Sequence, residues 1–328
     1  MRKAIIHIGL EKTGSTFIQD FFSKNRQAIK KHGLFYSRCL TGKNHARLVL
    51  LGQEDESKPN KIHRWAGLKP EAVSAANRTW LKGVETEKSN GLTFWASTEF
   101  LSSLLHEREN CLQFLDNMRR VFDEVSIVLF VRKQEDLLLS RYSTSVLDGN
   151  HKPMTFGKVP REIDVVSIID KWASVVTPEN FYVLPYFSDS HPRELIDILL
   201  RRTTGIEPDL SGFEWPEGDV NPRLTFSGLE AIRRINAHYG SIPIAKRREA
   251  LALLAGQTSH EQKFTLSAEK QREASEKFAA INEEISRALA ETDRDRFLQP
   301  GRSQASSNRY DPKLVERLEE SIITLINA

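Results

Sequence analysis

The sequence predicts an α/β fold in which a mostly parallel sheet is flanked by helices and a helical carboxy-terminal region follows. Four short, strongly apolar runs have the length of buried strands, and they span residues 4–8, 92–97, 125–131 and 180–185. Stretches with helical spacing of apolar residues accompany them, at residues 15–30, 108–121, 134–147 and 162–176. Because strands that alternate with helices join through βαβ crossovers, we expect helices on both faces of the sheet.

The first strand runs into a turn with the pattern of a phosphate-binding loop. Gly9, Gly14 and Thr16 keep the spacing of the nucleotide-binding pattern G-x-x-x-x-G-K-[ST], but position 15 is Ser and the lysine of the loop is Lys12. The glycines let backbone N–H groups point inward, and a helix that begins at Gly14 or Ser15 directs its positive dipole end to the same place. We expect an anion in this loop, and the displaced lysine disfavours an ordinary NTPase.

An amphipathic helix follows the loop, and a later strand has a carboxylate after its end. The helix should bury the apolar side chains that recur at helical spacing, which are Phe17, Ile18, Phe21, Phe22 and Ile29. The strand at 92–97 is followed by Glu99, whose carboxylate could accept a proton at the sheet edge where the loop lies. The competing interpretation is that Glu99 only favours the start of a helix over residues 100–105.

The strand at 125–131 is apolar throughout most of its length, as a strand covered on both faces should be, and it ends in Arg132. Ligands of open α/β sheets collect at that edge, where a guanidinium can bind a phosphate with two hydrogen bonds. Ser140, eight residues later on the next helix, can add a hydroxyl donor to the same group. An NTPase would be expected to place an aspartate there for Mg²⁺. The pattern favours a ligand with two separated anionic groups and no obligatory metal.

Composition is that of a folded protein without a membrane-spanning segment. The chain has 328 residues, of which 39% are hydrophobic and 28% charged, which is enough for one large core or two modest ones. The net charge of +3 is too small to indicate a nucleic-acid partner. A run of about 18 apolar residues is missing, and the amino terminus reads as a core strand, so we expect a cytoplasmic protein. Cys39 and Cys111 lack a metal-like spacing and are expected to be structural.

The pattern changes to helices in the carboxy-terminal part. Five stretches have helical spacing, and they span Pro192–Thr203, Ser227–His238, Ala245–Ala255, Ala268–Glu291 and Pro312–Asn327. Residues 205–223 are rich in Gly and Pro and read as a long loop, which is either a cover for a site or a plain connector. We expect residues 1–204 to form the ligand-binding α/β core and residues 205–328 to complete the same catalytic domain.

The two phosphate-binding motifs resemble those of a known family. The block from His7 to Thr16 resembles the 5′-phosphosulfate loop of the P-loop-type sulfotransferases that use 3′-phosphoadenosine-5′-phosphosulfate (PAPS). Arg132 and Ser140 resemble the family's 3′-phosphate motif, in which an arginine closes a strand and a serine lies on the next helix. The similarity is greatest to the bacterial members and the carbohydrate-modifying branch. It continues more faintly in Asn221-Pro222-Arg223 and from Asn282 to Phe297.

The resemblance implies a fold, a reaction and a set of roles. A sulfotransferase of this type moves a sulfuryl group from PAPS to a hydroxyl or amine, here of a glycan or glycolipid acceptor, releases 3′,5′-adenosine bisphosphate and needs no metal. The cradle would be the backbone N–H groups from Thr13 to Thr16 with the hydroxyls of Ser15 and Thr16. Lys12 would stabilise the charge that develops on the bridging oxygen.

The resemblance also implies candidates for the base that accepts the proton of the acceptor group. Glu99 is similar to the glutamate after the second core strand of the carbohydrate-modifying branch, so it is the first candidate. His45 is the second, since the cytosolic sulfotransferases of small molecules use a histidine base; the competing interpretation is an ordinary surface histidine. His7, inside the first strand, is expected to be a hydrogen-bonded core residue that shapes the loop.

Two alternatives to this function remain open at this point. One is a P-loop kinase or NTPase, against which the missing Lys at position 15 and the missing terminal aspartate both count. The other is a nucleotide-binding protein that keeps the fold but has lost turnover. No motif identifies the acceptor or the oligomeric state.

Overall fold

The computed structural model describes residues 1–38, 42–54, 61–86, 91–187, 191–205, 207, 209–216, 224–261, 263–299 and 310–327. Cys39 and the segment 221–223, which the sequence analysis singled out, lie outside the described residues. The chain forms two compact units. The first comprises Met1–Arg132, Pro160–Gly218 and Glu283–Leu298, and the second Lys133–Val159, Asp219–Asn282 and Gln299–Ala328.

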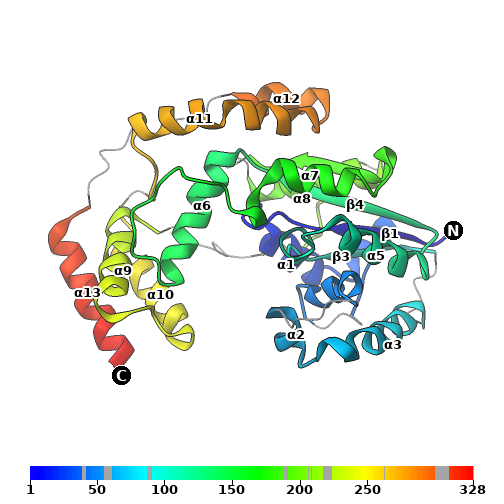
Figure 1. Ribbon diagram of the computed structural model, residues 1–328, viewed down its shortest axis with the longest axis horizontal. Coiled ribbons are helices and arrows are strands. Elements are labelled where there is room, and N and C mark those ends of the chain that lie inside the picture. The colour runs from blue at the N-terminus through cyan, green and yellow to red at the C-terminus, as the bar shows by residue number, and fades with distance from the viewer. Residues whose placement is uncertain are drawn as a thin grey trace. The chain divides into compact units, whose positions relative to one another are not determined.

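A five-stranded sheet organises the first unit (Figure 1). Its strands are β1 (Lys3–His7), β2 (Leu34–Tyr36), β3 (Thr93–Ser97), β4 (Glu124–Val131) and β5 (Phe181–Pro185). Their order is β2-β3-β1-β4-β5, and every neighbouring pair is parallel. The predicted α/β fold with a parallel sheet is therefore confirmed. The strand β2 was not predicted, because three residues are too few to give a readable alternation of apolar and polar side chains.

The α-helices of the first unit lie between and after these strands. They are α1 (Ser15–Lys24), α2 (Lys61–Ala66), α3 (Val73–Thr86), α4 (Phe100–Leu104), α5 (Arg108–Arg119), α7 (Val165–Ala173), α8 (Pro192–Thr204) and α12 (Glu291–Leu298). The expected helix at 15–30 is shorter in the structure. It ends because the side chain of Asn25 donates to the carbonyl of Phe21 at 2.8 Å, and a 3₁₀ helix (Ala28–His32) follows.

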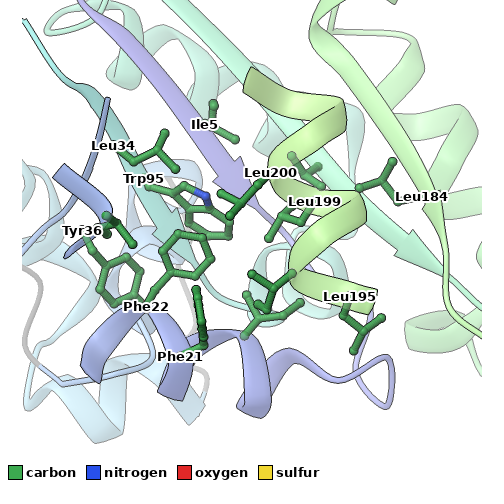
Figure 2. Packing of buried hydrophobic residues seen from close by; sticks show 14 of the residues in the cluster. Ile5, Phe21, Phe22, Leu34, Tyr36, Trp95, Leu184, Leu195, Leu199 and Leu200 are labelled. Atoms are coloured by element: carbon green, nitrogen blue, oxygen red, sulfur yellow. The ribbon is translucent and has the colours of Figure 1, made fainter. Parts of the chain in front are cut away.

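One face of the sheet is covered by α1 and α8 (Figure 2). Ile5 and Trp95 are paired in register and direct their side chains to this face. Phe22 of α1 packs on Trp95 with ring centroids 4.3 Å apart, and Leu199 of α8 belongs to the same buried cluster. Side chains of a strand alternate between faces, so Phe94 points to the other side, where it contacts Phe122 just beyond α5. The predicted helical cover on both faces is thus present.

Part of the long polar stretch after α8 is packed against α1. The side chain of Asn25 donates to the carbonyl of Glu214 at 2.7 Å and accepts from its N–H at 2.8 Å. Trp215 packs on Phe21, with ring centroids 5.0 Å apart. Residues 213–215 are therefore a structured part of the first unit.

The second unit is built from helices. They are α6 (Gln134–Leu147), α9 (Phe226–Tyr239), α10 (Arg247–Gln257) and α13 (Pro312–Asn327), together with most of α11 (Ala268–Arg287). The apolar faces of α6, α9, α10 and α13 share a buried cluster that includes Val146, Ile235 and Leu318, whereas Ala274 and Phe278 of α11 belong to a separate one. The side chain of Asn236 donates to the carbonyl of Val146 at 2.6 Å and so joins α9 to α6. The helical character of this region was predicted, although the expected helix at 268–291 ends at Arg287 and α12 begins at Glu291.

Among the described residues, no helix has the length and apolar character that crossing a membrane requires. Cys111 is a free thiol buried in α5, and burial raises its pKa to about 12. This environment fits the structural role expected for it.

Candidate functional site

The predicted residues of the first unit meet at the carboxyl edge of three adjacent strands. The central strand β1 pairs with β3 on one side and with β4 on the other. The glycine-containing loop follows β1, Glu99 follows β3 and Arg132 follows β4. In an open parallel sheet this edge is where ligands bind. The topology alone therefore places the loop between a carboxylate and a guanidinium.

The loop after β1 has the conformation expected of an anion-binding turn. Lys12 and Gly14 both have left-handed backbone conformations, with φ of 69° and 81°. Helix α1 begins at Ser15, as predicted, and its first internal hydrogen bond runs from the N–H of Ile18 to the carbonyl of Gly14 at 3.1 Å. Among the described residues no side chain caps this helix, and its first turn holds no acidic residue. The amide groups and the positive end of α1 therefore face the loop without an acidic side chain of their own turn.

Hydroxyl groups brace the loop from inside. Thr13 and Ser15 each donate to the carbonyl of Leu10 at 2.8 Å, and both are buried. The turn thus brings the Leu10 carbonyl within reach of both hydroxyls. Thr16, in contrast, is exposed. Binding of a ligand by Ser15 and Thr16 stays a prediction.

Arg132 is anchored to the loop. It is only 4% exposed, and its Nη1 donates to the carbonyl of Lys12 at 3.3 Å. Its guanidinium lies 5.1 Å from the ring centroid of Tyr186, which follows β5. Backbone hydrogen bonds fix this geometry, because Leu10 donates to Phe130 at 3.1 Å and Phe130 donates to Gly9 at 2.7 Å. Backbone hydrogen bonds thus join the start of the loop to the end of β4, and the buried Arg132 lies beside both.

Glu99 is held by two side-chain amides from separate segments. Gln19 of α1 donates to its Oε2 at 2.8 Å, and Asn44 donates to its Oε1 at 3.0 Å. Glu99 occupies the N-cap position of α4, but its side chain makes no capping hydrogen bond to that helix. The two amides direct the half-buried carboxylate as a positioned acceptor would need. Helix capping by the Glu99 side chain is therefore not observed, and its role as the base stays a prediction.

The absence of a side chain at Gly9 lets the loop approach Glu99. A Cβ atom at Gly9 would lie 3.0 Å from the Cα of Glu99 and 3.0 Å from the Oγ of Ser102. The φ of Gly9 is 107°, which side chains rarely adopt. The start of the loop and the candidate base are therefore in van der Waals contact.

Two buried histidines make hydrogen bonds with Ser97 at the end of β3. The Nδ1 of His7 lies 2.8 Å from the Oγ of Ser97, and the N–H of Ser97 donates to the Nδ1 of His45 at 3.2 Å. Burial lowers the pKa of both histidines to about 3. His7 is therefore the hydrogen-bonded core residue that the sequence predicted. The expectation of a surface histidine at position 45 is wrong, because His45 is fully buried and its ring centroid lies 4.4 Å from that of Tyr36. The 3₁₀ helix Ala46–Gly52 follows it.

Ser140 lies on α6, in the second unit. Its convergence with Arg132 on one phosphate therefore stays a prediction. Sequence reasoning missed Gln19 and Asn44. The only signal for Gln19 was its place on α1 one turn beyond Ser15, on the same face of the helix. Asn44 gave no signal, since it belongs to no regular element. Among the described residues, no three His, Cys, Asp or Glu side chains are grouped as metal ligands.

Comparison with known proteins gives similarities to three solved structures. Neither a protein-family model nor a curated protein matches the sequence. The chain is similar to a sulfotransferase from Alicyclobacillus acidocaldarius, with 14% identity and a TM-score of 0.40 over 76% of this chain and 99% of that one. It is also similar to the sulfotransferase domain of the Synechococcus PCC 7002 olefin synthase, with 14% identity and a TM-score of 0.33 over 64% and 74% of the two chains. A third similar structure is the sulfotransferase domain of the curacin biosynthetic pathway, with 12% identity and a TM-score of 0.39 over 85% of this chain and 98% of that one.

Proposed function

We propose that this protein is a PAPS-dependent sulfotransferase that acts on a hydroxyl or amine of a glycan or glycolipid. The observation that carries the proposal is the position of Arg132. The buried guanidinium of Arg132, directly after β4, donates to the backbone of the loop, at the point where an NTPase would hold Mg²⁺ with an aspartate. A cation at this place suits a ligand that brings a second phosphate instead of a metal.

The residues present fit such a ligand. Gly14 starts α1 in a left-handed conformation, and a Cβ there would lie 2.6 Å from the Cδ1 of Leu195, so the turn depends on glycine. The amides after it and the ammonium of Lys12 would hold the 5′-phosphosulfate. Arg132 would hold the 3′-phosphate, assisted by Ser140. PAPS, when bound, supplies the sulfuryl group and a bisphosphate leaving group.

The chain's own residues account for the remaining steps. Glu99, directed by Gln19 and Asn44, would take the proton of the acceptor hydroxyl, whose oxygen forms the new bond to sulfur. Lys12 would neutralise the charge on the bridging oxygen while the bond between that oxygen and sulfur breaks. The proton then leaves Glu99 for solvent, and the sulfate ester and 3′,5′-adenosine bisphosphate are released. An amine acceptor follows the same balance of atoms.

A transfer assay tests this function. Purified protein is incubated with radiolabelled PAPS and a panel of oligosaccharides and glycolipids, and labelled products are separated by chromatography. We expect transfer to at least one acceptor, and Glu99→Gln should lower kcat about a hundredfold, a typical effect of losing a general base. The matched control is Glu109→Gln, which removes an exposed carboxylate from α5 and should leave kcat unchanged.

Other outcomes would change the assignment. Transfer of a phosphoryl group from ATP with Mg²⁺, in place of sulfuryl transfer, would show a kinase. Tight binding of 3′,5′-adenosine bisphosphate without any transfer would favour the non-catalytic alternative. Unchanged kcat in Glu99→Gln would keep the reaction and remove Glu99 as the base.

A further inference from the structure

A basic pocket lies beyond the site, at the other end of α1. It has a volume of about 390 Å³ and is lined by Ser23, Arg26, Arg38, Gly42 and Lys43. Three of these five residues are cationic. Asp20 pairs with Lys43 at 2.7 Å. Cations near the carboxyl end of a helix are expected for Arg26, but Arg38 and Lys43 come from a different segment and have no such reason to gather there.

Side-chain contacts hold the residues of the pocket wall together. The Nη1 of Arg26 donates to the Oγ of Ser23 at 2.8 Å and to the carbonyl of the same residue at 3.0 Å. The guanidinium lies 5.1 Å from the ring centroid of Tyr36, which is buried and donates through its hydroxyl to the carbonyl of Lys43 at 2.6 Å. The aromatic ring therefore ties the segment that carries Lys43 to the wall formed by Arg26.

Contacts connect the pocket to the candidate base. Lys43 is followed directly by Asn44, whose amide holds the carboxylate of Glu99 at 3.0 Å. On the other side, Ser15, Gln19 and Ser23 are spaced by four residues on α1, so they lie in one row on a single face of the helix. Along that row, Ser15 belongs to the loop, Gln19 contacts Glu99 and Ser23 lines the pocket. Each step is about 6 Å long.

We propose that the basic pocket binds an oxyanion group of the acceptor, so that the acceptor is an anionic compound. The proposal rests on the proposed function, because it takes Glu99 as the base. The row on α1 then gives the order of the groups: the sulfuryl donor at the loop, the acceptor hydroxyl at Glu99, and a carboxylate, phosphate or sulfate of the acceptor in the pocket. Gln19, which contacts Glu99, and Ser23, which lines the pocket, are one turn of α1 apart, about 6 Å along the helix axis. An acidic sugar unit fits this description.

Calorimetry with matched sugars tests the proposal. The probes are p-nitrophenyl β-D-glucuronide, the 6-phosphate of p-nitrophenyl β-D-glucoside, and the neutral glucoside, each titrated into the full chain with and without 3′,5′-adenosine bisphosphate. We expect at least one anionic probe to bind about tenfold more tightly than the neutral glucoside, an effect of the size of a charge-assisted hydrogen bond. The two anionic probes distinguish a carboxylate from a phosphate.

The variant Arg38→Gln with Lys43→Gln should remove that preference, because both residues are exposed cations of the pocket wall. The matched control, Lys82→Gln with Arg119→Gln, removes two exposed cations from α3 and α5 and should keep the preference. Equal affinity of the wild-type protein for all three probes would overturn the proposal, as would an unchanged preference in the pocket variant.

The same titrations separate this proposal from the proposed function. If 3′,5′-adenosine bisphosphate binds but no probe is preferred, the pocket assignment fails and the sulfotransferase assignment stands. If the charge preference is present and depends on Arg38 and Lys43 while the bisphosphate does not bind, the pocket binds anions, but the proposed function fails and with it the pocket's role as an acceptor site. Circular dichroism of each variant shows that the fold is intact.

Discussion

The side-chain amide of Gln19 donates a hydrogen bond of 2.8 Å to the Oε2 of Glu99, which is 80 residues away in the sequence. This contact joins the helix after the phosphate-binding loop to the strand end that carries the candidate base. It makes Gln19 a positioning residue, since it would act on the reaction only through the carboxylate.

Gln19→Ala should therefore lower kcat about tenfold and leave KM for the donor nearly unchanged, because the loss of one hydrogen bond to a charged group loosens the base without touching the loop. Steady-state kinetics at varied donor concentration measure both constants. Gln27→Ala, at an exposed position after α1, is the matched control and should behave as wild type. An increase in KM with constant kcat would show that Gln19 serves donor binding instead.

Gly9→Ala should separate the loop from Glu99. The new Cβ would meet the backbone of Glu99 at 3.0 Å in addition to the strain of a φ of 107°, so we expect a loss of about 1–3 kcal/mol in the free energy of unfolding. Gly91→Ala has a φ of 82° and, among the described residues, no atom within 4 Å of its Cβ, so it reports the strain alone. Urea unfolding measures both variants. Equal destabilisation would mean that the close approach at Gly9 has no energetic consequence.

The buried histidines should make the fold sensitive to acid. The pKa of His7 and of His45 is about 3 in the folded protein, below the ordinary value of 6.5, because burial disfavours the charged ring. Below about pH 6.5 the unfolded chain thus binds more protons than the folded one. Their contribution to the free energy of unfolding is complete above that pH and falls toward pH 3, by about 1.4 kcal/mol per pH unit for each histidine.

Urea unfolding at pH 7, 6 and 5 measures this slope. His45→Gln should reduce the slope by about 1.4 kcal/mol per pH unit between pH 6 and 5. His260→Gln, at an exposed position of the second unit, should leave it unchanged. Identical slopes in the wild type and in His45→Gln would contradict the assignment of a buried, neutral ring.

Cys111 should resist alkylation in the folded protein. Burial raises the pKa of its thiol to about 12, so almost none of the reactive thiolate is present at pH 8. Iodoacetamide treatment followed by mass spectrometry of the peptide around Cys111 should give label only after unfolding in urea. Rapid labelling of the native protein would show that this part of α5 opens readily.

The sequence could predict those features that are written in contiguous residues. The run from Val125 to Val131 and the turn from Gly9 to Thr16 combine apolar strand composition with a chemical group at the end, and their strands proved to be neighbours. The two hydrogen bonds that hold the Glu99 carboxylate could not be predicted, because Gln19 and Asn44 reach it only through tertiary packing. Burial of His45 was also hidden, since it depends on Tyr36 in a strand too short to recognise.

The most direct test of the central claim is calorimetric titration with 3′,5′-adenosine bisphosphate and with ATP, each with EDTA and with Mg²⁺. We expect the bisphosphate to bind without metal and more tightly than ATP, and Arg132→Ala to weaken it about a hundredfold through loss of charge-assisted hydrogen bonds. Arg120→Ala, at an exposed position beyond α5, should bind it as the wild type does. Tighter binding of ATP with Mg²⁺, unaffected by Arg132→Ala, would contradict the sulfotransferase assignment.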